Sequence, residues 1–422
     1  MTLPAIHEID KIVFPEPEKI PLQNNIPLFG FNGTKNDILR IDLIFNAGRW
    51  TETLPLQSAF VASLFKSGTS KYTSFEINEM IDSLGSTLKS ASGFNSFTVS
   101  IYCMNRYLEQ TLSHAILCLN ECIFPEQELE HQKRKSLANL SLSLEKNDYL
   151  ADNAFKKQIF GNRHPYGYET TREKIEQLTR EHLLHYYQRE LCPAKCTVFI
   201  AGKYGQDELK VLDRVLGGWS KEYRHGQADV KAIPAIPAFE RNVLHIRKEK
   251  SVQASIVIGN VLFNKQHDDY AAFVLLNTIF GGYFGSRLMS NIREDKGLTY
   301  GIHSGLFTLK HAGLFSIQTD TNLENVEVCL REIYSEMERL QNERIPEAEI
   351  ALARNYLLGK FLGRTDGPFN QAEVFKSYSI ENVNIHKFSE IVETLRQTDA
   401  VSLQRLAQQY LLKENMLEVA VG

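Results

Sequence analysis

Two stretches of the chain match each other and set its organisation: IFPEQELEHQKRKSLANL at residues 123–140 and RIPEAEIALARNYLLGKF at residues 344–361. Their prolines, at positions 125 and 346, are 221 residues apart. A second pair, HYYQRELCPAKCTVFIAG at 185–202 and AQQYLLKENMLEVAVG at 407–422, ends in glycines that are 220 residues apart. Two separate anchors that agree within one residue indicate a duplicated domain, because solenoid repeats have periods of only about 20–50 residues.

The pattern of apolar residues predicts the same kind of fold in both halves. Strands are expected over 38–48, 97–103, 253–260 and 313–319, and helices over 74–88, 126–158, 268–280 and 346–363. The strands are grouped and do not alternate strictly with helices, which favours an α+β fold of mostly antiparallel sheets with helices on one face. We therefore expect two homologous domains, 1–228 and 238–422, joined by an extended linker around 226–242 that contains two prolines.

Composition excludes several classes of protein. The 422 residues include 47 Lys and Arg against 51 Asp and Glu, without a dense basic stripe, so nucleic acid is not an expected partner. The N-terminal residues mix charges with prolines, and no run of 18 apolar residues occurs, so neither a signal peptide nor a membrane partner is expected. Six cysteines without a C-x-x-C pair are typical of reduced thiols, and we expect a cytoplasmic protein.

Three longer stretches carry a resemblance to a known family. They are FKSGTSKYTSFEINEMIDSLGSTLKSASGFNSFTVSI (65–101), RHPYGYETTREKIEQLTREHLLHYYQRELCPAKCTVFIAG (163–202) and GGYFGSRLMSNIREDKGLTYGIHSG (281–305). Together they resemble the pitrilysin/insulinase metallopeptidases, which bind zinc through an inverted H-x-x-E-H motif. The resemblance covers about residues 30–422 and is to the short, processing-peptidase-like branch. It implies that the chain forms half of a clamshell around a chamber in which peptides are cleaved.

The zinc motif itself is degenerate in this chain. In the family the H-x-x-E-H helix runs into F-x-G-T, which Phe65–Thr69 matches, so the resemblance places the motif positions at Ser58, Val61 and Ala62. Valine and alanine offer no donor atom to zinc, and serine is a poor zinc ligand. Glu130 falls near the family's third ligand, and as a single carboxylate it is expected to be a helix-surface charge. We expect no metal and no cofactor in this chain, with zinc in a partner subunit.

A functional pair remains in NIREDKGLTYGIHSG, at Arg293 and Tyr300. An arginine followed seven residues later by a tyrosine does not by itself indicate a function, because Arg293 could pair with neighbouring acids and Tyr300 could simply begin a strand. The resemblance implies more: both side chains reach, in trans, the zinc site of a partner subunit. There Arg293 would bind substrate carbonyls or a carboxylate, and Tyr300 would donate to the oxyanion that forms during peptide hydrolysis.

Two functions are consistent with these residues. The first is a non-catalytic subunit of a heterodimeric zinc metallopeptidase, inactive alone, that degrades or processes unfolded peptides with a zinc-bearing homologous subunit. The second is an inactive homologue that serves as a peptide-binding or structural scaffold, as a homodimer. An independent peptidase with a displaced metal site is disfavoured, because no alternative ligand set is visible. His182 and His185 lie in a segment that the family uses as a packing helix, and His303 and His311 lie on either side of an expected hairpin, where exposure is the simpler interpretation.

Overall fold

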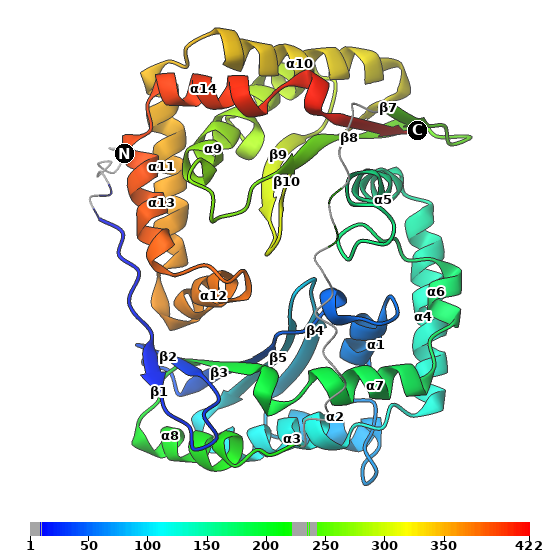
Figure 1. The fold of residues 1–422 in the computed structure, drawn as a ribbon, viewed down its shortest axis with the longest axis vertical. Helices are drawn as coiled ribbons and strands as arrows, with labels where there is room; N and C mark the ends of the chain where they lie inside the picture. Colours follow the sequence, from blue (N-terminus) through cyan, green and yellow to red (C-terminus); the bar gives the residue numbers. More distant parts are fainter. Residues whose placement is uncertain (1–8, 10, 222–233, 235, 237–242) are drawn as a thin grey trace, which may run out of the picture.

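The computed structural model describes residues 9, 11–221, 234, 236 and 243–422, which form two sheets with helices around them (Figure 1). Most of the expected linker around 226–242 lies outside the described residues. None of the described helices is both long enough and apolar enough to span a membrane.

The first sheet has six strands in the order β1-β2-β6-β3-β5-β4. They are β1 (Glu18–Ile20), β2 (Leu28–Asn32), β3 (Ile38–Phe45), β4 (Thr87–Ser92), β5 (Phe97–Met104) and β6 (Cys196–Gly202). Only β2 and β6 run parallel among the neighbouring strands of this sheet. The expected strands over 38–48 and 97–103 are confirmed as β3 and β5.

The second sheet has five strands in the order β7-β11-β8-β10-β9. They are β7 (Val243–Ile246), β8 (Gln253–Leu262), β9 (Ile302–Thr308), β10 (Gly313–Asn322) and β11 (Leu417–Val421). Here too one neighbouring pair, β7 and β11, is parallel and the others are antiparallel. The two sheets share one strand order, with β7, β11, β8, β10 and β9 in the places of β2, β6, β3, β5 and β4. This agrees with the expected duplication and the mostly antiparallel α+β class.

Helices of each half cover one face of its own sheet. On the first sheet these are α1 (Gln57–Ser63), α2 (Ser74–Asp82), α3 (Leu108–Glu121), α7 (Arg180–Glu190) and α8 (Gln206–Leu212). On the second, α9 (Tyr270–Asn277) and α10 (Val326–Asn342) contact the strands, and α14 (Ala400–Tyr410) packs on both of these helices. Helices α11 (Glu347–Arg364) and α13 (His386–Gln397) pack against α9 and against each other. The short α6 (Arg172–Glu176) lies against α4 (Glu126–Leu144).

Two expected helices differ from the structure. The stretch expected as one helix over 126–158 is two helices, α4 and α5 (Asn147–Phe160), because Lys146 between them has extended backbone. The helix expected over 74–88 ends as α2 at Asp82, and Gly85, at a φ of +59°, lets the chain turn into β4.

The opposite face of each sheet is covered by a helix from the other half, which the sequence did not predict. Helix α5 lies on the second sheet, where Phe155 and Ile159 are buried with Val257 of β8 and Val419 of β11 (Figure 1). Helix α12 (Gly367–Ile380) begins 220 residues after α5 and lies on the first sheet. The duplicated helices are therefore exchanged between the halves.

Aromatic side chains make up much of the contact between α12 and the first sheet. The ring centroid of Phe375 on α12 lies 5.0 Å from that of Phe29 on β2 and 5.9 Å from that of Phe199 on β6. Phe29 and Phe199 point away from the helices of the first half. Successive side chains of a strand point to opposite faces of the sheet, and Leu28, the residue before Phe29, belongs to the core on the side of those helices. Each sheet therefore has packed side chains on both faces.

A buried ionic cluster also joins α12 to the first sheet. The carboxylate of Asp42 on β3, which is 2% exposed, lies 2.8 Å from Arg40 Nη2 and 3.2 Å from Lys376 Nζ of α12. Ser100 Oγ donates to Asp42 at 2.5 Å, and Glu373 pairs with both cations at 2.6 Å. The two halves are therefore tied by charges as well as by apolar packing.

Candidate functional site

The three degenerate motif positions lie on α1, inside the first half. Ser58 and Val61 are fully buried, and Ala62 is 9% exposed. The carbonyl of Ala62 accepts a hydrogen bond from Ser90 Oγ of β4 at 2.7 Å. Because α1 is packed between β4 and α7, these positions act as core residues.

The Ser58 hydroxyl faces a buried carboxylate, Glu52, that no sequence pattern predicts. Ser58 donates to Glu52 Oε1 through both Oγ, at 2.5 Å, and N–H, at 2.8 Å. The Leu56 N–H and the Tyr168 hydroxyl donate to Glu52 Oε2, and the Arg49 guanidinium lies over the Tyr168 ring. Burial raises the pKa of Glu52 although these bonds act in the opposite direction.

The raised pKa gives a pH-dependent prediction for Glu52→Gln. The native carboxyl takes up a proton at a higher pH than the unfolded chain does, so its contribution to stability is lost as pH rises through the native pKa. The stability of the wild type relative to Glu52→Gln should therefore be greatest at about pH 4 and decline toward pH 7. Urea unfolding of both proteins across this range measures the difference, and a difference that grows with pH would contradict the assignment.

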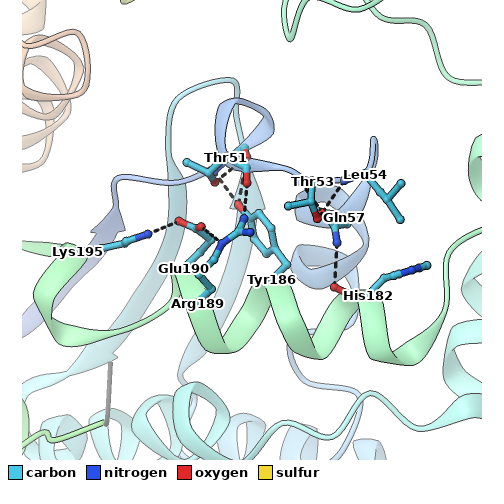
Figure 2. Close-up of polar contacts among 10 residues, drawn as sticks. Thr51, Thr53, Leu54, Gln57, His182, Tyr186, Arg189, Glu190 and Lys195 are labelled. Carbon is cyan, nitrogen blue, oxygen red and sulfur yellow. Dashed lines mark hydrogen bonds and ion pairs between the residues drawn. The ribbon is translucent and has the colours of Figure 1, made fainter. Parts of the chain in front are cut away.

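The loop before α1 is anchored by α7, as Figure 2 shows. Gln57 Oε1 accepts from the N–H groups of Thr53 and Leu54, and its Nε2 donates to the carbonyl of His182. The Tyr186 hydroxyl accepts from the Gly48 N–H at 2.7 Å, and Arg189 donates to the Thr51 carbonyl. At the end of α7, Lys195 donates to Glu190 at 2.7 Å. The His182 imidazole accepts from the Thr179 N–H at the start of α7, while His185 is exposed. Helix α7 thus has the packing role that the resemblance implied.

Glu130 has the surface position expected of it. Its half-exposed carboxylate lies 2.8 Å from Lys133 Nζ on the same helix, α4. In the described part of the chain, no group of three or more His, Cys, Asp or Glu side chains is arranged to hold a metal ion. The six cysteines are free and buried, and burial raises the pKa of Cys118 to about 12, which disfavours the thiolate that metals bind.

Arg293 lies in a π-helical segment, Met289–Asp295, at the surface of the second half. Its guanidinium carbon is 4.8 Å from the ring centroid of Phe284, which is itself 64% exposed. Nη1 is 4.0 Å from the Glu294 carboxylate, at the outer limit of an ion pair. The sequence left open that Arg293 simply pairs with a neighbouring acid, and in the structure its ion pair with Glu294 is weak.

Tyr300 is the most exposed of the large hydrophobic side chains in the described residues, at 94%. It does not begin a strand, since β9 starts at Ile302. The backbone on either side is nevertheless held: Thr321 Oγ1 donates to the Leu298 carbonyl at 2.7 Å, and Thr319 Oγ1 donates to the Gly301 carbonyl at 3.0 Å. A fixed backbone with a projecting phenol presents Tyr300 to solvent or to a partner.

Known proteins match most of the chain. A family model described as "Peptidase M16 inactive domain" matches residues 177–357. YmxG of Bacillus subtilis, an uncharacterized zinc protease, is 22% identical over 357 residues, which are 83% of this chain and 83% of YmxG. An uncharacterized zinc protease of Mycobacterium leprae is 26% identical over 355 residues, which are 81% of this chain and 76% of that protein.

Solved structures share the fold over nearly the whole chain. A peptidase M16 inactive domain from Pseudomonas fluorescens has a TM-score of 0.85 at 19% identity, covering 96% of this chain and 98% of that one. A protease from Helicobacter pylori has a TM-score of 0.81 at 16% identity, covering 97% and 100%. A chain of complex III2 from Candida albicans has a TM-score of 0.74 at 15% identity, covering 96% and 95%. The arrangement of two duplicated halves is thus common to all three.

Proposed function

Because the chain belongs to the peptidase M16 family, we propose that it is a zinc-less subunit that works with a zinc-bearing homologous subunit to degrade or process unfolded peptides. Arg293 and Tyr300 of this chain would complete the active site of the partner, which holds the zinc. The observation that carries the proposal is Tyr300: it is 94% exposed on a backbone fixed by threonines of β10. The expected place of action is the cytoplasm, where the buried free cysteines stay reduced.

The chemistry divides between the two chains. The zinc of the partner would supply a nucleophilic water and polarise the scissile carbonyl. Tyr300 would donate its hydroxyl to the oxygen on which negative charge develops, a role that requires a hydroxyl held in place before the reaction. Arg293 would bind carbonyls or a carboxylate of the peptide through its planar fork of N–H donors.

A prediction about metal content follows from the side chains at the degenerate motif. The purified chain should contain less than about 0.1 zinc per molecule, because valine and alanine cannot ligate a metal and Ser58 is bonded to Glu52. Elemental analysis after gel filtration measures this, and the same sample should not cleave a quenched fluorescent peptide. Near-stoichiometric zinc that a chelator removes, together with chelator-sensitive turnover, would contradict the proposal.

The proposed pairing is tested by capture from native cell extract. The tagged chain should retain a homologue that contains H-x-x-E-H, and the captured complex should cleave unfolded peptides only in the absence of chelator. A matched bait, Tyr300→Phe, should capture the same homologue. A homologue captured without any peptidase activity, or capture of a second copy of this chain alone, would favour the scaffold function.

A further inference from the structure

The segment that carries Arg293 has an irregular backbone. In Met289–Asp295 the helix widens, and the Lys296 N–H donates at 3.1 Å to the carbonyl of Asn291, five residues earlier. Gly297, with a φ of +61°, ends the segment. Such π-helical turns are rare and often occur at functional sites. The direction of Arg293 therefore depends on the groups that hold this segment.

Two carboxylates of α10 hold it through Asn291. Glu336 Oε1 accepts from Asn291 Nδ2 at 2.8 Å, and Glu332, one turn earlier, accepts from the same nitrogen at 3.3 Å. Lys296 donates to Asn291 Oδ1 at 2.7 Å and pairs with Glu332. Both ends of the Asn291 amide are thus engaged, which fixes the side chain and the turn it belongs to.

Glu336 is an unusual residue for its position. It is 1% exposed and lies on the buried face of α10, beside the core residues Met337 and Leu340. Oε1 is bonded to Asn291 and to Arg339 Nη1, but Oε2 is buried without a hydrogen bond among the described residues. Burying a carboxylate that is only partly satisfied costs stability, so an apolar residue would pack better here.

We propose that Glu336 is a positioning residue, which acts through Asn291 to hold the π-helical segment so that Arg293 faces the peptide; its effect on catalysis rests on the function proposed above. The part of Glu336 that matters is the acceptor Oε1, which binds the Asn291 side chain. Asn291 lies two residues before Arg293 in the same segment. A side chain of similar volume without this acceptor should release the segment and leave the fold intact.

Hydrogen–deuterium exchange of the purified chain tests the positioning without any partner. Glu336→Met, which keeps the volume, and Asn291→Ala should each speed exchange over 289–300 at least about 10-fold. Glu336→Gln keeps an acceptor oxygen and should stay within about 3-fold of the wild type. The control Glu338→Met changes an exposed residue on the same helix. Unchanged exchange in Glu336→Met, or an equal loss in Glu336→Gln or in the control, overturns the proposal.

Kinetics with the zinc-bearing subunit test the link to Arg293. Glu336→Met should raise KM about 10-fold with kcat changed less than about 3-fold, because Arg293 binds the peptide, and it should add nothing further in an Arg293→Ala background. A full additional loss in that background would mean general damage and overturns the link. If Arg293→Ala alone changes nothing, the proposed function fails, while the exchange experiment still decides whether Glu336 holds the segment.

Discussion

Replacing Tyr300 with phenylalanine should lower kcat of the two-chain peptidase by about 10²–10³, the usual loss for one oxyanion donor, with little change in KM. The change removes only the hydroxyl. Since the Tyr300 side chain is 94% exposed, it contributes almost nothing to the core, and the variant should fold and unfold like the wild type. A loss confined to kcat would then report chemistry and not structure.

The measurement is steady-state cleavage of a quenched peptide by the reconstituted complex, with zinc content and complex formation checked for each variant. Tyr72→Phe is the matched control, because Tyr72 is also an exposed tyrosine, at 38%, but lies in the first half. Arg293→Lys is an informative companion: it keeps the charge and loses the planar fork, so KM should rise. Equal kcat for Tyr300→Phe and the control would remove Tyr300 from the mechanism.

The parts of the fold that local patterns determine could be predicted from the sequence. Strands β8 and β10 are rich in apolar and β-branched residues and pair over ten residues, and both were expected within three residues of their ends. The boundary between α4 and α5 was missed, since neither proline nor glycine marks Lys146. A pattern of apolar residues shows which face of a helix is buried, but it does not show which sheet buries it.

The candidate site shows the same division. Ser58, Val61 and Ala62 were identified because the loss of donor atoms is visible in the residue types themselves. Glu52 was not identified, because its bond to Tyr168 joins residues 116 positions apart and no local signal marks it. Likewise, the backbone on either side of Tyr300 is held by Thr319 and Thr321, about 20 residues further along the chain. Only the pairing of β9 with β10 brings these threonines to it, so the sequence alone does not predict that Tyr300 is exposed.

The exchange of α5 and α12 leads to the second large prediction, a loss of stability in Asp42→Asn. This change leaves Lys376 and Arg40, which are largely buried, with the single carboxylate of Glu373. Removing one partner from a buried ion pair typically costs about 3–5 kcal/mol, because the remaining charge is desolvated and unpaired. We expect a loss in this range, and faster hydrogen exchange in α12 before the first sheet itself opens.

Guanidinium unfolding and exchange of the purified chain measure both effects. Asp37→Asn is the control, since Asp37 pairs with Lys203 at 2.6 Å on the surface and its side chain is 71% exposed, so its loss should leave the midpoint nearly unchanged. If Asp42→Asn behaves like this control, apolar contacts such as Phe375 on Phe29 hold α12 by themselves. If α12 exchanges faster while the strands stay protected, the buried charges are what hold this helix of the second half on the sheet of the first.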